Sequence, residues 1–467
     1  MYNTRQYIKT AALTFCIAVF GFSCKKSFLE VTPKGKVIAT KTSEYDLLLN
    51  NTDLININAD AQIPMGDEVA AVDPSFSAEA YRPQRLFRWE ADVYQPADDA
   101  PETVIPLRGL FAYNMIINEV LNSTEGTDLQ KKNVQAEALA GRAWTYFLLI
   151  NYYGKPYNAA TAATDPGFPI ITAADITQSS FSRATVQEVY DLMVKDLITA
   201  IPNLSSDGTW SRIRMSKCAA QALLAKIYIF MGRYSDALPL LNSAIALLPS
   251  STIATDFYDY NAAFPGFPTI VNDQENVYAK NIFNTYTGAS TTLQLTPTAG
   301  ALYGSTDLRR SKWYVATSFP NGLTLLRRSG NYSNSYGIRV PDMYLLRAEC
   351  KARANDLSGA VSDLETLRKK RMPVADAAVP AAAAAQKATL VQYIMEERIR
   401  EFAVQGFRWF DMRRLTTDPL YAGVTYQHLQ YGADGTVKTT FSLKPERLTL
   451  RIPPKILLQN PNLADNP

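Results

Sequence analysis

The chain has 467 residues, which is enough for a large buried core and one to three domains. Its 47 lysines and arginines nearly balance its 44 aspartates and glutamates, so no charge field exists that would attract nucleic acid. The one histidine, His428, excludes a zinc site of the HExxH type and argues against a histidine-based catalytic triad.

The N-terminus predicts a targeting segment and a lipid anchor. Arg5 and Lys9 precede an apolar stretch at residues 11–22, which is shorter than the roughly 20 residues that a membrane span needs. Small residues then lead to Cys24, as in a lipobox, where the cysteine is acylated and becomes the first residue of the mature chain. We therefore expect a lipoprotein signal peptide at residues 1–23. An ordinary signal peptide that ends near a chance cysteine is the alternative.

Two long regions lack a sustained helical period. They cover residues 43–106 and 251–340 and are rich in glycine, proline, asparagine, threonine and aromatic residues. Irregular stretches of this length in a compact protein are usually functional, and their aromatic content argues against disorder. We expect them to form the ligand-binding face of a single domain at residues 24–467.

Between and after these regions, the sequence predicts a tetratricopeptide-like helical scaffold, so the expected fold class is mostly α with long irregular loop regions. The clearest repeat, residues 224–249, places Ala225 and Ala237 where two antiparallel helices approach closely, and Tyr228 and Leu241 fill the seam. Two further helix pairs have the same offsets, and such pairs must stack to bury their faces. The second pair spans residues 339–372, and the third is split between 136–153 and 185–201. The whole scaffold covers about 107–250 and 339–415. A C-terminal segment follows at 416–467.

Cysteine and motif content exclude several kinds of site. Cys218 and Cys350 both fall within predicted helices among apolar residues, so we expect buried free thiols. The sequence has no Gly-rich phosphate loop and no GxSxG or CxxC motif. We expect neither a metal nor a cofactor.

A helical stretch near the C-terminus embeds charge in apolar sequence. Glu397 and Glu401 are like charges one helical turn apart, so they need cations nearby, which Arg408 or Arg413 would supply. Gly406 then takes a left-handed conformation that ends the helix. We expect a structural ion network that pins the helix to the body of the protein. A glycoside hydrolase that uses the two glutamates is the alternative, although carboxylates at this spacing point to one spot.

The same stretch resembles the C-terminal signature of the SusD/RagB family of nutrient-binding lipoproteins. Gln405 stands where the family usually has glutamate. Weaker matches, together with the lipobox, extend the resemblance over nearly the whole chain; they lie at residues 137–143, 152–156, 451–454 and 460–463. The residues that carry the signature are Glu397-Arg398, Glu401, Gly406-Phe407-Arg408 and Asp411-Met412-Arg413-Arg414.

This resemblance implies a surface-exposed outer-membrane lipoprotein, anchored through Cys24, that is not an enzyme. Such a protein binds an oligomeric nutrient, most often a glycan, and delivers it to a SusC-like TonB-dependent transporter. The resemblance leaves open whether the ligand is an oligosaccharide or a peptide. The helical repeats alone are also compatible with a tetratricopeptide adaptor that binds protein segments.

We expect ligand contacts from flat aromatic rings flanked by polar groups, a composition that both irregular regions have. Trp313 is the preferred platform because charged residues surround it, although Asp307-Leu308-Arg309 resembles a family segment that braces the loop. Packing of the rings onto the scaffold is the alternative, for Trp89 above all. For Asp67-Glu68 we expect an ordinary surface or cap role rather than a calcium or ligand contact. The five candidate ligand-binding residues are Trp313, Tyr303, Tyr81, Trp89 and Tyr94.

Overall fold

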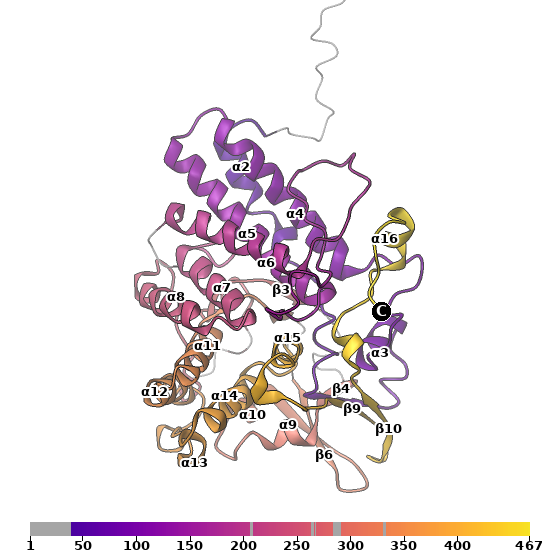
Figure 1. Cartoon of the computed structure of the whole chain (residues 1–467). Coiled ribbons are helices and arrows are strands. Elements are labelled where there is room, and N and C mark those ends of the chain that lie inside the picture. The colour runs from indigo at the N-terminus through magenta and orange to yellow at the C-terminus, as the bar shows by residue number, and fades with distance from the viewer. Residues whose placement is uncertain (1–38, 206–208, 263–265, 267, 284–290, 330–332) are drawn as a thin grey trace, which may run out of the picture. The chain divides into compact units, whose positions relative to one another are not determined.

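Helices are the predominant regular secondary structure of the computed structural model, and Lys41 to Pro467 form one compact unit (Figure 1). The predicted signal peptide at residues 1–23 and the predicted lipid attachment site, Cys24, lie outside the described residues. Within the described ranges, every helix is too short or too polar to span a bilayer. The structure describes residues 39–205, 209–262, 266, 268–283, 291–329 and 333–467.

The predicted tetratricopeptide-like pairs are present as neighbouring helices, α5 with α6, α7 with α8, and α11 with α12, and α4 packs on α5 (Figure 1). Ala225 and Ala237 are completely buried in the seam between α7 and α8, and Gly232 has the positive φ of +73° that the turn requires. The scaffold helices are α2 Thr42–Leu48, α4 Pro101–Glu119, α5 Asp128–Tyr153, α6 Val186–Ala200, α7 Lys217–Phe230, α8 Tyr234–Leu247, α11 Val340–Arg353, α12 Leu357–Arg368, α14 Lys387–Phe402 and α15 Arg408–Leu415. The mostly α fold class is therefore confirmed.

Capping residues explain where the helices of the split pair begin. The Thr127 hydroxyl accepts a hydrogen bond from the backbone N–H of Gln130, whose side chain accepts one in return from the N–H of Thr127. Thr185 and Glu188 form the same capping box at the start of α6. Each box satisfies backbone donors that a helix N-terminus would otherwise leave unpaired.

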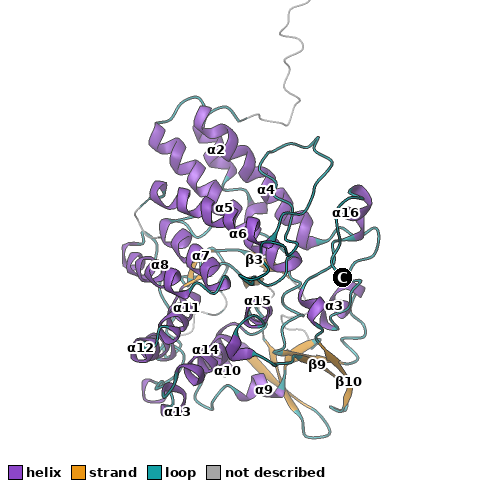
Figure 2. Ribbon diagram, viewed as in Figure 1, coloured by secondary structure: helices purple, strands orange, loops and turns teal. Residues whose placement is uncertain are grey.

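The two irregular regions and the C-terminal segment share one six-stranded sheet of order β10-β9-β1-β4-β6-β5 (Figure 2). β1, from the first region, pairs antiparallel with β4, from the second, and parallel with β9, from the C-terminal segment. The strands of the six-stranded sheet are β1 Val69–Val72, β4 Leu293–Leu295, β5 Tyr314–Ser318, β6 Thr324–Arg328, β9 Gln427–Tyr431 and β10 Val437–Ser442. Two small sheets pair β2 Asn276–Tyr278 with β8 Ile338–Arg339 and β3 Asn281–Phe283 with β7 Ser333–Ser335.

These strands correct the expectation that both regions are loops without regular structure. The strands have two to six residues, so alternation between buried and exposed side chains is too brief to stand out in the sequence. β1 and β4 are also buried along their whole length and therefore do not alternate at all. The short helices outside the scaffold are α3 Tyr81–Phe87, α9 Pro297–Ala301, α10 Leu308–Trp313, α13 Ala381–Ala384 and α16 Pro454–Gln459.

Cys218 and Cys350 are buried free thiols, as predicted. The described residues contain no group of three or more histidine, cysteine or acidic side chains placed to hold a metal ion.

Candidate functional site

The predicted ion network is present on α14, and most of its cations come from distant parts of the chain, although Arg400 on the same helix also lies 3.0 Å from Glu397. Arg309 donates to both carboxylates, at 2.7 Å to Glu397 and 3.0 Å to Glu401. Arg368 lies 2.9 Å from Glu397, and Arg371 lies 2.7 Å from Glu401. Burial alone would raise the pKa of Glu397, but the guanidinium groups around it, that of Arg309 foremost, hold it well below its usual range. The bracing role expected for the segment that contains Arg309 is therefore confirmed.

The two arginines expected to neutralise these glutamates bind elsewhere, so that prediction was wrong. Arg408 makes two bonds to the carboxylate of Asp67, at 2.5 and 2.9 Å. Arg413 donates to the backbone carbonyls of Asn151 and Gly154. Both arginines lie on α15, which follows the turn after α14 and directs them toward other parts of the chain.

The rest of the signature forms a second, connected set of ion pairs. Arg398 bridges Asp342 at 2.7 Å and Asp411 at 2.6 Å, and Arg414 joins Asp411 at 2.9 Å to Glu349 at 2.8 Å. All five side chains are buried. Each carboxylate is paired with a guanidinium group, as in a structural network and unlike two glycosidase carboxylates that face a substrate from separate elements.

Three of the five candidate aromatic residues are buried: Trp89 and Tyr94 are 4% exposed, and Tyr303 is 3% exposed. The indole Nε1 of Trp89 donates to the carbonyl of Met65 at 3.1 Å, and the Tyr94 hydroxyl donates to Glu102 at 2.6 Å. The Tyr303 hydroxyl donates to a backbone carbonyl of α14 at 2.9 Å. Rings this deeply buried offer no face to a ligand, so these three residues pack their segments onto the scaffold.

The other two candidates are half-buried and lie on different elements. Tyr81 begins α3, and the guanidinium of Arg85 lies 4.1 Å from its ring centroid. Trp313 ends α10; its Nε1 donates to the Tyr260 hydroxyl at 3.0 Å, and the Arg328 guanidinium lies 4.9 Å from its ring. Trp313 is therefore held from more than one side, and none of the five candidates lines any of the four cavities described below.

A cavity of about 390 Å³ lies where α9, α14, α15 and the start of β9 meet, and we call it the Glu68 cavity. Its lining comes from both irregular regions, the signature stretch and the C-terminal segment. The volume falls within the range of ligand pockets in proteins. Its charged and polar lining residues are Asp67, Glu68, Thr296, Thr298, Glu396, Arg408, Thr425, Tyr426 and Gln427.

Glu68 is the unusual member of this lining. It is 2% exposed, and its Oε1 accepts a hydrogen bond from the N–H of Val404 at 3.2 Å. Its Oε2 has no hydrogen-bond partner among the described residues. Burial, reinforced by the neighbouring Asp67 carboxylate, raises the pKa of Glu68 to about 8. The expected surface or cap role of Glu68 is therefore wrong: its carboxyl group is buried beside a cavity.

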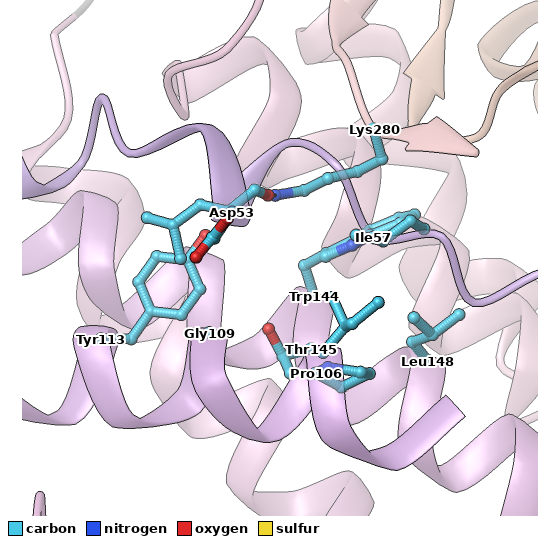
Figure 3. Close-up of a pocket in the computed structure, with 11 residues that line it drawn as sticks. Asp53, Ile57, Pro106, Gly109, Tyr113, Trp144, Thr145, Leu148 and Lys280 are labelled. Carbon is cyan, nitrogen blue, oxygen red and sulfur yellow. The ribbon is translucent and has the colours of Figure 1, made fainter. Parts of the chain in front are cut away.

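A second cavity, between α4 and α5, holds a buried lysine (Figure 3). The ammonium of Lys280 donates to the carbonyl of Leu54, and burial lowers the pKa of Lys280 to about 7. The indole N–H of Trp144, which lines the same cavity, has no partner among the described residues. The volume of about 20 Å³ has room for one water molecule, so the cavity is too small for a sugar.

Two further cavities lack the mixed chemistry that directed binding needs. A groove of about 320 Å³ between α4 and α16 is lined mainly by apolar side chains such as Leu107, Phe111 and Ile456. A cavity of about 430 Å³ beside α2 has polar walls that include Asp46 and Glu125 but no aromatic residue. The Glu68 cavity combines apolar, aromatic and charged groups and is the strongest candidate among the four.

Two family models match successive parts of the chain. One, described as starch-binding and associating with the outer membrane, matches residues 27–229, and the model of the SusD family matches residues 250–467. The chain belongs to the SusD family. This family is one of binding proteins rather than enzymes, which agrees with the fully paired carboxylates of the signature.

Individual SusD-family proteins resemble the chain at low identity. A SusD-like protein of Formosa agariphila is 24% identical over 353 residues, which is 60% of this chain; the chain spans 65% of the length of that relative. A putative sugar binding protein of Bacteroides vulgatus has the same fold, with a TM-score of 0.71, 20% identity, and coverage of 92% of this chain and 99% of that one. A SusD superfamily protein of Bacteroides thetaiotaomicron has a TM-score of 0.72 at 17% identity and covers 91% of this chain and 100% of its own.

Sequence reasoning missed most of the Glu68 cavity. Its walls combine Thr298 on α9, Glu396 on α14 and Tyr426 before β9, which no sequence pattern connects. One local signal was available, since Asp67 and Glu68 form an acidic pair within otherwise apolar sequence. A carboxyl group in such a setting is either paired with a cation, as Asp67 is with Arg408, or has a raised pKa, as Glu68 has.

Proposed function

We propose that this SusD-family chain is a surface-exposed outer-membrane lipoprotein that binds an oligomeric carbohydrate and delivers it to a SusC-like TonB-dependent transporter. It acts by binding and release, without a cofactor. Family membership supports association with the outer membrane and a carbohydrate ligand, and the lipobox cysteine Cys24 supports a lipid anchor.

One structural observation carries the proposal for this chain. The two irregular regions join the C-terminal segment in a single sheet, apart from the stacked helices of the scaffold. This arrangement leaves the helical repeats as a support and gives the irregular regions a common surface for recognition. Tyr81, which is half-exposed on α3, remains a candidate ligand contact on this side of the chain. Trp313 is a candidate only if ligand binding breaks the hydrogen bond from its indole to the Tyr260 hydroxyl.

The anchor is tested by replacing Cys24, the proposed site of acylation. Cells that produce the Cys24→Ala variant are labelled with radioactive palmitate and fractionated. We expect uncleaved or soluble protein without label, since the acyl chains supply the membrane affinity. A variant that still carries label and still fractionates with the outer membrane would show that Cys24 is not the anchor.

Binding and partner are tested separately. Calorimetry of the purified chain against oligosaccharides and against peptides distinguishes a carbohydrate-binding protein from a peptide-binding member of the same family. Pull-down from solubilised membranes is expected to recover one large outer-membrane barrel protein. Recovery of soluble proteins alone would favour the tetratricopeptide adaptor, and product formation from any glycan would favour a hydrolase.

A further inference from the structure

The turn between α14 and α15 has a backbone conformation that one of its residues disfavours. Ala403 has φ −55° and ψ 139°, and Val404 has φ +62°. The N–H of Gln405 donates to the carbonyl of Phe402 at 3.0 Å. These features are those of a type II β-turn with Val404 at its third position, where the positive φ normally requires glycine or asparagine. For a β-branched residue this conformation is strained.

Two contacts hold Val404 in the strained state. Val404 is 1% exposed, and its side chain belongs to the core. Its N–H donates to Oε1 of Glu68 at 3.2 Å, whereas Oε2 of Glu68 has no hydrogen-bond partner among the described residues. The strain of the turn is therefore tied to the position of the Glu68 carboxyl group.

A type II turn has a close alternative. When its central peptide rotates by about 180°, the turn becomes type I, in which the residue at the third position has a negative φ. Here that rotation relieves the strain at Val404 and exchanges two polar groups: the Val404 N–H turns away from Glu68, and the Ala403 carbonyl takes its place. The Tyr314 hydroxyl lies 3.4 Å from this carbonyl, so the rotation breaks only a weak hydrogen bond.

Glu68 distinguishes the two orientations because a carboxyl group changes from acceptor to donor when it gains a proton. An ionised carboxylate can only accept, so it favours the Val404 N–H and the type II turn of this structure. A protonated carboxyl group can donate, so it favours the Ala403 carbonyl and the type I turn. The two forms of one side chain thus favour opposite orientations of one peptide.

We propose that the Ala403–Val404 peptide is a two-position switch, in which the type II turn accompanies the ionised form of Glu68 and the type I turn accompanies its protonated form. The turn connects α14, which carries Ile399, to α15, which carries Arg408, and both residues line the Glu68 cavity. A rearrangement of the turn therefore acts on the cavity wall from within the fold, whichever ligand the chain binds.

Crystal structures of the mature chain at pH 6 and pH 10 test the orientation directly. Burial raises the pKa of Glu68 to about 8, so the two conditions lie on either side of its titration. We expect the Ala403 carbonyl to point toward Glu68 at pH 6 and away from it at pH 10. The same orientation in both structures would overturn the switch.

Selective labelling follows the same peptide in solution. Alanine labelled with carbon-13 at its carbonyl and valine labelled with nitrogen-15 give one cross peak for each Ala–Val pair in an NMR spectrum. The mature chain has four such pairs, which are Ala71-Val72, Ala360-Val361, Ala378-Val379 and Ala403-Val404. Val404→Ile assigns the Ala403-Val404 peak by removing it. We expect that peak to move or split with a midpoint near pH 8, and the other three peaks measure any general effect of pH. A peak that stays constant would contradict the proposal.

Variants separate the strain from the proton. Val404→Gly accepts the positive φ without strain, so we expect roughly tenfold more of the type II turn and a midpoint lower by up to about one pH unit. Asn355→Gly, at φ +67° in the exposed turn between α11 and α12, is the matched control and is expected to leave the midpoint unchanged. A Val404→Gly chain with the midpoint of the parent would overturn the switch.

Glu68→Gln tests whether Glu68 is the titrating group. Its amide both accepts and donates without ionising, so we expect the pH dependence of the peptide to disappear. Other charged or titratable groups lie near Glu68 and are common to both chains: Asp67, Tyr314, Glu396, Arg408, Tyr426 and His428. Any pH dependence that remains in Glu68→Gln would come from these groups and would overturn the assignment to Glu68.

Discussion

The indole of Trp89 lies flat against the imidazole of His428, with ring centroids 3.8 Å apart and ring planes at 14°. The ring of Phe87 stacks on the same imidazole at 4.2 Å. The two imidazole nitrogens lie 2.6 and 2.7 Å from the carbonyl oxygens of Phe87 and Gly66. This stack joins the first irregular region to β9, so the only histidine of the chain packs the sheet against α3.

The stack predicts that Trp89 is needed for stability. We expect Trp89→Ala to lower the free energy of unfolding by about 3–5 kcal/mol, because it leaves a large void in the core. Trp89→Phe keeps an aromatic ring but loses the hydrogen bond to the Met65 carbonyl. We expect the lost bond to lower the free energy of unfolding by about 1 kcal/mol, in addition to the cost of repacking the smaller ring. Urea denaturation measures both. Trp210→Ala, at an exposed position, is the control with an expected loss of about 1 kcal/mol or less. A Trp89→Ala variant that is stable but binds ligand more weakly would instead identify Trp89 as a ligand contact.

Removing one carboxylate of the signature network is expected to be costly. Glu401→Ala removes a carboxylate that Arg309 and Arg371 share and leaves buried positive charge that Glu397 and Glu275 balance only in part, so we expect a loss of about 3–5 kcal/mol. Glu396→Ala, on the same helix but partly exposed, is expected to cost about 1 kcal/mol or less. Thermal and chemical denaturation of the two variants side by side supplies the comparison, and equal losses would contradict the buried network.

Gly406 combines a backbone requirement with a packing requirement. Its φ is +89°, and a Cβ atom there would lie 2.7 Å from Cγ of Gln62. Gly406→Ala is therefore expected to lower the free energy of unfolding by about 2–3 kcal/mol. Gly423→Ala has a similar φ of +80° but open space around the added methyl group, so its loss is expected to be only about 1 kcal/mol. If the two losses were the same, contact with Gln62 would play no part.

Lys280 predicts a characteristic dependence of stability on pH. Its folded-state pKa of about 7 lies below the ordinary value of 10.5, so the unfolded chain binds a proton at this site that the folded chain does not. The free energy of unfolding therefore falls by up to about 1.4 kcal/mol per pH unit as the pH decreases between these two values, and no further below about 7. Lys280→Met is expected to remove this slope.

Urea denaturation at pH 7, 8, 9 and 10 measures the difference between Lys280→Met and the parent chain. Other groups titrate in the same pH range, but both chains contain them, so their contributions cancel in the difference between the two free energies of unfolding. Lys195→Met, at an exposed position of α6, is expected to leave the slope unchanged. A Lys280→Met slope equal to that of the parent chain would mean that Lys280 is charged in the folded state.

The helical part of the fold was predictable because its signal repeats. Ala225 and Ala237, with Tyr228 and Leu241, recur at fixed offsets that only closely packed helix pairs require, and all four are buried where the pattern predicts. The need for cations around Glu397 was also predictable from charge alone.

The identity of the cations from outside the helix was not predictable, because Arg309, for example, lies 88 residues before Glu397 and reaches it only through the tertiary fold. The same limit applies to Glu68, whose partner Val404 lies 336 residues away. For the aromatic residues, composition indicated a binding surface, but composition does not distinguish a ring on the surface from one beneath it. Trp89, Tyr94 and Tyr303 are of the second kind.

The position of β9 near the end of the chain has a consequence for the order of assembly. The Glu68 cavity needs β9 and Tyr426 as well as residues near the start of the domain, so it cannot close until almost the entire polypeptide is available. The helices from α4 to α8 depend mainly on contacts with near neighbours in the chain and can form earlier. The scaffold helices can therefore form first, and the walls of the Glu68 cavity come together only when the last strands of the sheet have paired.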